Sequence, residues 1–172
     1  MKKYNFLKWF ILSIAVAINL FILINAFITG EASAKESNTI AHTAADVINT
    51  VKPNTITPKN FPTFAFNLRK AVGHFGLFAL SGGFTSWALY LFIKNTKVKW
   101  FVYQLSMTLG YGLLLASITE LTQIFVDGRT GTFADIGIDF GGYFLGVFLV
   151  FLILLLKKSP IFKREKTSGN QV

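Results

Sequence analysis

The sequence contains no cysteine, only two histidines and four prolines, and eight acidic residues against 17 basic ones. Without cysteine the chain cannot form a disulfide bond or use a thiol nucleophile. It also lacks a glycine-rich phosphate-binding loop, an H-E-x-x-H pair and a G-x-S-x-G elbow. The sequence therefore excludes thiol catalysis and carries no local signature of P-loop nucleotide binding, of a zinc peptidase or of a serine hydrolase.

Long apolar runs are what the sequence has in abundance. Hydrophobic residues make up 52% of the 172 residues, with 19 phenylalanines among them. They form four runs, at about residues 6–28, 71–93, 101–125 and 136–156. Each run reaches the roughly 20 residues that a helix needs to cross about 30 Å of hydrocarbon, where backbone groups must be satisfied within the segment. We therefore predict an all-α membrane protein with four transmembrane helices in one domain, residues 5–157.

The basic residues predict the orientation of these helices. Eleven of the 17 lysines and arginines lie before the first run, between the second and third, or after the fourth. The positive-inside rule then places both termini in the cytoplasm and makes residues 158–172 a basic cytoplasmic tail. Membrane boundaries and anionic lipid head groups explain the net charge of +9, so nucleic-acid binding is not expected.

The N-terminus also resembles a secretory signal peptide. Lys2 and Lys3 precede an apolar run, and Ala32-Ser33-Ala34 has the form of an A-x-A cleavage site. However, the run is longer than the usual apolar region of about 7–15 residues, and the A-x-A sequence follows several residues after it ends. An intact first helix is the favoured interpretation, with cleavage as the alternative.

The longest segment outside the four runs connects the first two. Its first half, residues 37–51, has apolar residues at 40, 44, 47, 48 and 51, which is the spacing of an amphipathic helix. Its second half, residues 52–62, contains three prolines and predicts an extended loop. We expect a short amphipathic helix on the outer membrane surface or over the end of the bundle, with His42 on its solvated face.

Ionisable residues lie inside or beside three of the apolar runs, although a charge at the centre of a membrane helix costs about 2.5–3.5 kcal/mol. The predicted topology brings them together at the outer ends of helices two, three and four. Glu120 and Gln123 are three residues apart and share a helical face. The fourth helix carries two acids and two glycines on one stripe, the glycines at a spacing for close helix packing: Asp135, Asp139, Gly142 and Gly146. This outer polar layer contains Arg69, Lys70, His74, Glu120, Gln123, Asp127, Arg129, Asp135 and Asp139.

The residues alone leave two interpretations of the outer polar layer. In the structural interpretation, Lys70 and Arg129 neutralise buried carboxylates and fix how the helices meet. In the functional one, the layer is a site open to the outer leaflet, because ionisable residues within a membrane are functional candidates. Its basic rim, which adds Arg69, suits an anionic head group, a phosphate or a carboxylate.

A metal site in this layer is not expected. Its candidate ligands come from three helices and lack a compact spacing signature: His74, Glu120, Asp135 and Asp139. The sequence accordingly predicts no metal and no other cofactor.

Taken in order, these residues resemble the VanZ-like family. The pattern consists of Arg69-Lys70-x-x-x-His74-Phe75, Glu120-x-x-Gln123-x-Phe125, Arg129, and Asp135-x-x-x-Asp139-x-x-Gly142-x-x-x-Gly146. With the leading helix and the outer loop, the resemblance covers residues 5–155. The chain departs from the family at Asp139, where members usually carry Asn.

The resemblance implies a multi-pass protein of the bacterial cell membrane, associated with teicoplanin resistance in Gram-positive bacteria. Teicoplanin carries an acyl chain that can enter a bilayer, so the expected function is non-enzymatic action at the outer leaflet on a lipoglycopeptide or on cell-envelope lipid. The implied partners are membrane lipids and a lipoglycopeptide or lipid-linked wall precursor, and the oligomeric state stays open.

Two other functions compete with this one. The alternative is an intramembrane enzyme that acts on a lipid head group, with Glu120 or His74 as general base and Arg129 steadying an anion. Transport of a small ion is disfavoured, because four helices show no inverted repeat or broken segment.

Overall fold

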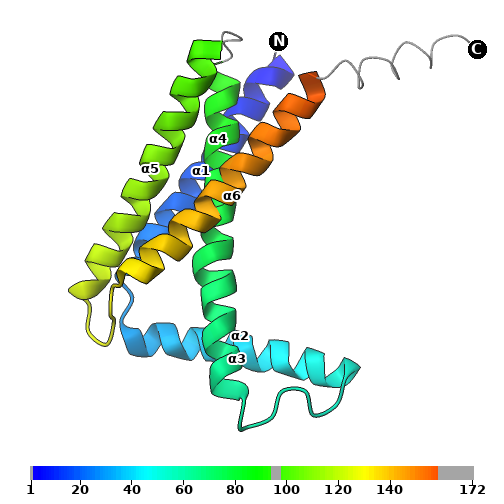
Figure 1. Cartoon of the computed structure of the whole chain (residues 1–172), viewed down its shortest axis with the longest axis vertical. Coiled ribbons are helices and arrows are strands. Elements are labelled where there is room, and N and C mark those ends of the chain that lie inside the picture. Colours follow the sequence, from blue (N-terminus) through cyan, green and yellow to red (C-terminus); the bar gives the residue numbers. More distant parts are fainter. Residues whose placement is uncertain (1, 94–97, 159–172) are drawn as a thin grey trace, which may run out of the picture.

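Helices account for the regular structure of the chain in the computed structural model, which describes residues 2–93 and 98–158 and the side chains of residues 5–93 and 102–156 (Figure 1). Four helices form a bundle: α1 (Lys2–Ala26), α4 (Leu77–Ile93), α5 (Val98–Ile124) and α6 (Phe133–Lys158). A further helix, α2 (Gly30–Val51), crosses one end of the bundle. The short helix α3 (Phe61–Leu68) continues through a π-helical segment, η1 (Arg69–Gly76), into α4.

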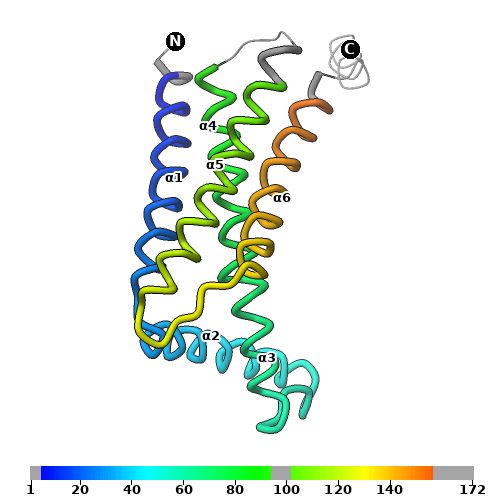
Figure 2. The backbone as a smooth tube through the Cα atoms, turned by 60° about the vertical axis from the view of Figure 1, so that its left-hand side comes forward, coloured from blue at the N-terminus to red at the C-terminus, as the bar shows by residue number. Residues whose placement is uncertain are grey.

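Four described segments are long and apolar enough to cross a membrane, which confirms the predicted all-α fold with four membrane helices. They are Asn5–Ala26, Phe61–Ile93, Val102–Ile124 and Phe133–Leu156. Large apolar side chains are exposed on every one of them, as expected where lipid surrounds the bundle. The start of α1 and the end of α6 lie together at the end opposite α2 (Figures 1 and 2). Their cytoplasmic placement stays a prediction, and residues 159–172 of the predicted tail lie outside the described residues.

The second membrane segment begins earlier than the sequence predicted. The apolar run starts at residue 71, and the sequence predicts that residues 64–70 begin the helix above the membrane. The helix instead starts at Phe61, because Pro62 occupies its first turn, where a missing backbone N–H costs no hydrogen bond. The extended loop predicted at residues 52–62 is thereby reduced to residues 52–60. The extra turns extend this helix beyond the other three, where it meets α2 (Figure 2).

The helix in the first outer connection is also longer than the predicted 37–51. It begins at Gly30, and the side chain of Thr29 accepts a hydrogen bond from the backbone N–H of Ala32 at 3.4 Å. His42 is exposed, as expected, and its ring stacks on Phe61 of α3 with ring centroids 4.1 Å apart. α2 lies across the end of the bundle (Figure 2). Its contact with a membrane surface stays a prediction.

Glycines bring α6 against the second membrane segment. A Cβ atom at Gly142 would run into the backbone carbonyl of Phe75, and one at Gly146 would run into that of Ala79. Packing of this kind, with small residues at the contact, is how membrane helices approach closely without a hydrophobic driving force. The two helices run in the same direction (Figure 1), and this contact fixes the register between α6 and η1.

Candidate functional site

The register between η1 and α6 pairs two bases with two acids. Lys70 forms an ion pair with Asp135, and the Nδ1 atom of His74 lies 3.0 Å from the Oδ1 atom of Asp139. Both pairs are separated by 65 residues in the sequence. The two pairs are therefore neighbouring contacts along the same helix–helix interface, because positions four apart lie one above the other on each helix. The π-helical segment carries both bases, and such segments occur often at functional sites.

Glu120, on α5, is the buried carboxylate of the outer polar layer that this helix contributes. Its side chain is 2% exposed and accepts hydrogen bonds from Nε2 of Gln123 at 3.1 Å and from the backbone N–H of Thr132 at 3.0 Å. The loop can return this close because Gly131 lies against the backbone carbonyl of Glu120, where a side chain would collide. Thus the carboxylate is held by its own helix and by the α5–α6 loop.

Three of the four candidate metal ligands come together. One donor atom from each of His74, Glu120 and Asp139 lies within 4.8 Å of the other two, and Asp139 is only 1% exposed. The Nδ1 atom of His74 lies 3.9 Å from Oε1 of Glu120. The fourth candidate, Asp135, is instead held by Lys70 and by the hydroxyl of Thr132. Donors that are far apart in the sequence therefore lie close together in the structure, which their spacing in the sequence did not predict.

Arg129 lies within ion-pair distance of no carboxylate among the described residues, although the structural interpretation of the sequence expected it to neutralise one. Its guanidinium donates to Oε1 of Gln123 at 3.2 Å and to the backbone carbonyls of Asn25 and Ile28 at 3.0 Å each. Asn25 lies in the last turn of α1 and Ile28 just after its end, a position where cations are favoured. Burial lowers the pKa of Arg129 from its ordinary value, and Arg69 lowers it further, whereas Glu120 raises it.

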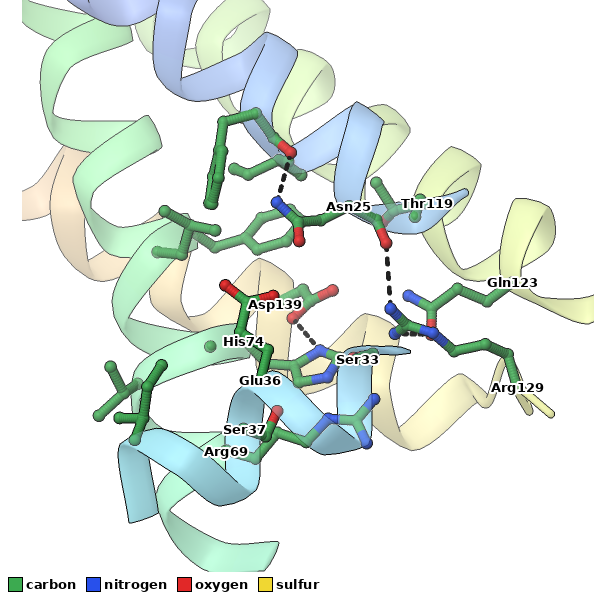
Figure 3. A pocket seen from close by; sticks show the side chains of 18 residues that line it. Asn25, Ser33, Glu36, Ser37, Arg69, His74, Thr119, Gln123, Arg129 and Asp139 are labelled. Atoms are coloured by element: carbon green, nitrogen blue, oxygen red, sulfur yellow. Dashed lines mark hydrogen bonds and ion pairs between the residues drawn. The ribbon is translucent and has the colours of Figure 1, made fainter. Parts of the chain in front are cut away.

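A pocket of about 270 Å³ opens beside this layer. Figure 3 shows that Arg69, His74, Arg129 and Asp139 line it together. Apolar side chains from α1, α2, η1 and α4 form part of the wall: Phe21, Ile22, Ile40, Val72, Leu77 and Phe78. Polar side chains line it as well, among them a second acid: Asn25, Ser33, Glu36, Ser37 and Thr119. Gln123 also lines the pocket, whereas Glu120, Lys70 and Asp135 do not. Asp127 is exposed on the α5–α6 loop and lies outside the pocket.

Several features of the site were missed from the sequence. The contributions of α1 and α2, including Asn25 and Glu36, carry no local signal because they depend on how distant helices meet. Backbone groups such as the N–H of Thr132 and the carbonyl of Ile28 are present in every residue and are assigned only by the fold. The two glycines at positions 128 and 131 were a usable signal, since they indicate a tight loop.

The ion pair between Lys70 and Asp135 should show measurable coupling. We expect Lys70→Met and Asp135→Asn each to lower the thermal midpoint of the purified protein, and the double variant to lower it by less than the sum. The expected coupling energy is about 1 kcal/mol, because the pair is partly exposed. A double-mutant cycle followed by tryptophan fluorescence measures it, and strictly additive effects would show that the pair contributes no stability.

Comparison with known proteins identifies the family of the chain. The VanZ/LLP1 family matches residues 9–155, which include most of all four bundle helices and every residue of the polar layer. No curated protein and no solved structure matches the chain. Four membrane helices and a match over most of the sequence lead to one conclusion: the chain is a multi-pass membrane protein that belongs to the VanZ/LLP1 family.

Proposed function

We propose that this protein binds the anionic head group of an amphiphile at the outer leaflet of a bacterial cell membrane. In this way it acts, without catalysing a reaction, on a lipoglycopeptide such as teicoplanin or on a cell-envelope lipid. The observation that carries the proposal is the pocket, which is lined by two arginines and a histidine together with apolar side chains of α1 and α4. A volume of about 270 Å³ fits a head group with the start of a chain rather than a whole lipid.

The two arginines of the pocket differ in what else they hold. Arg129 is committed to Gln123 and to two backbone carbonyls. Arg69 lines the same pocket, and no hydrogen bond or ion pair joins its side chain to the described part of the chain. A guanidinium in this situation offers its planar fork to a phosphate or carboxylate. Arg69 is therefore the residue that we expect to contact the ligand most directly.

Binding is tested with the purified protein in a neutral detergent. The probes are a short-chain phosphatidylglycerol and a phosphatidylcholine of the same chain length, titrated and followed by native mass spectrometry. We expect the anionic lipid to bind more tightly, and Arg69→Ala to weaken it about tenfold, because a hydrogen bond to a charged group contributes about 1.5–3 kcal/mol. Lys35→Ala, on α2 but outside the pocket, is the matched control and should bind as wild type does.

Two outcomes would contradict the proposal. Equal binding of both lipids would show that the pocket does not recognise the anionic group, and an equal loss with Arg69→Ala and Lys35→Ala would indicate general attraction to a basic surface.

Resistance is tested separately, by the teicoplanin and vancomycin susceptibility of a Gram-positive host with matched membrane levels of wild type and Arg69→Ala. We expect wild type to protect the host against teicoplanin and Arg69→Ala to abolish this protection. If wild type gives no protection, the protein has no role in teicoplanin resistance.

A second candidate, an intramembrane enzyme acting on a lipid head group, is favoured by a different observation. His74 lies in the pocket wall, and the carboxylate of Asp139 holds its ring, an arrangement found in catalytic histidines. The two functions differ in their effect on membrane composition. Lipid profiles of the same host that change on expression of wild type would favour the enzyme, and unchanged profiles would exclude it.

A further inference from the structure

The described residues contain a buried pair of carboxylates with only one histidine within ion-pair distance. Glu120 and Asp139 are 2% and 1% exposed. Lys70 is paired with Asp135, and Arg129 donates to an amide and to two backbone carbonyls. Among the described side chains, only His74 lies within ion-pair distance of either buried acid. Buried charges of one sign are costly unless a group of opposite charge is close.

We propose that His74, Glu120 and Asp139 bind one divalent transition-metal ion, for which Zn²⁺ is the best match. A divalent cation balances the two carboxylates, and the imidazole then binds it as a neutral ligand. Imidazole favours zinc and its neighbours over magnesium and calcium, which prefer sites made of oxygen alone. The site does not depend on the proposed binding of an amphiphile.

The distances between the donor atoms fit such an ion. Ligands of a tetrahedral zinc site, each at about 2.0–2.2 Å from the metal, lie roughly 3.4 Å apart. Here Nδ1 of His74 is 3.0 Å from Oδ1 of Asp139 and 3.9 Å from Oε1 of Glu120. The donors come from η1, α5 and α6, so an ion among them would join three of the helical elements.

The surroundings of the three ligands match what metal sites require. Metal-binding carboxylates are themselves hydrogen-bonded, and Glu120 accepts from Gln123 and from the N–H of Thr132. His74 and Asp139 also line the pocket, whereas Glu120 does not. Three protein ligands with one side toward a pocket leave a coordination position for water or for an oxygen of a pocket ligand, as in catalytic rather than structural zinc sites.

Metal binding is tested on the full-length protein, purified in detergent with a histidine-free tag and stripped with a chelator. Zn²⁺ is titrated against a competing chromophoric chelator, and Co²⁺ is added to a second sample to record its visible spectrum. We expect one ion per chain and ligand-field bands typical of four- or five-coordinate Co²⁺. The nearly isosteric variants Glu120→Gln, Asp139→Asn and His74→Gln should each weaken Zn²⁺ binding by more than about tenfold. The matched controls are His42→Gln and Asp127→Asn, which remove an exposed histidine and an exposed carboxylate and should bind as wild type does.

Thermal unfolding of the same samples provides a second readout. Zn²⁺ should raise the midpoint of wild type and of both controls but not of the three ligand variants, because only a folded site gains from the ion. Binding below one ion per chain, or equal binding by wild type and by every folded ligand variant, would overturn the proposal. The titration contains no added amphiphile, so its failure leaves the proposed head-group binding standing, and failure of lipid binding leaves the metal site standing.

Discussion

Gly142→Val should destabilise the protein more than any other single substitution for which we predict an effect. A Cβ atom at this position would meet the backbone carbonyl of Phe75, which cannot move as a flexible side chain can. The variant must separate α6 from η1, and this also pulls Asp135 and Asp139 away from Lys70 and His74. We expect a loss of about 3 kcal/mol or more, and a fall in the thermal midpoint on the order of 10 °C.

Gly137→Val is the matched control for this prediction. Gly137 lies earlier on the same helix and is exposed, and a Cβ atom added there would meet no neighbouring atom within 4 Å. We expect its stability to stay close to that of wild type, within about 0.5 kcal/mol. Intrinsic fluorescence of the three tryptophans measures both variants in detergent. Similar losses in the two variants would show that α6 tolerates no β-branched residue, rather than that Gly142 sets the register.

Arg129→Ala should give the second large loss of stability. The substitution removes three hydrogen bonds, so the carbonyl of Ile28 loses the guanidinium donor and that of Asn25 keeps only the backbone N–H of Ile28, at 3.3 Å. Hydrogen bonds to charged groups contribute about 1.5–3 kcal/mol each, so a total near 3 kcal/mol and a midpoint lowered on the order of 10 °C are expected. Arg129→Lys should recover only part of the loss, because an ammonium group lacks the planar fork that reaches all three acceptors.

Arg69→Ala separates this structural role from a role in binding. Arg69 lines the same pocket, but its side chain makes no hydrogen bond within the described part of the chain, so the variant should unfold near the wild-type temperature while binding less anionic lipid. Arg129→Ala should both unfold at a lower temperature and bind less anionic lipid. If the two variants unfold at the same temperature, the contacts of Arg129 with the end of α1 are not what stabilises this end of the bundle.

The membrane helices follow from the sequence because their cause is local. Four apolar runs of sufficient length must be helical in lipid, and the structure has four such segments among its described residues. The apolar run of the second segment starts at residue 71, and its helix was expected to begin at about Phe64, three residues after its observed start at Phe61. Hydropathy does not report where a helix continues beyond the apolar run, and Pro62 was taken as a breaker although the first turn of a helix tolerates it.

The gathering of ionisable residues at one end of the bundle also follows from the sequence. The high cost of a charge in hydrocarbon restricts these residues to helix ends, and the alternation of the helices places Lys70, Glu120 and Asp135 at the same end. Spacings of four residues, as between Lys70 and His74, further indicated which positions share a face. This much required only the period of a helix and the thickness of a membrane.

The partners of these residues were decided by the tertiary structure alone. Arg129 lies among acids in the sequence, yet it binds the end of α1, about a hundred residues away. His74, Glu120 and Asp139 converge because glycine contacts fix the register of α6 and because Gly131 lets the α5–α6 loop return to Glu120. The rotation and register of packed helices depend on close contacts between distant segments, and no periodicity within a single segment encodes them.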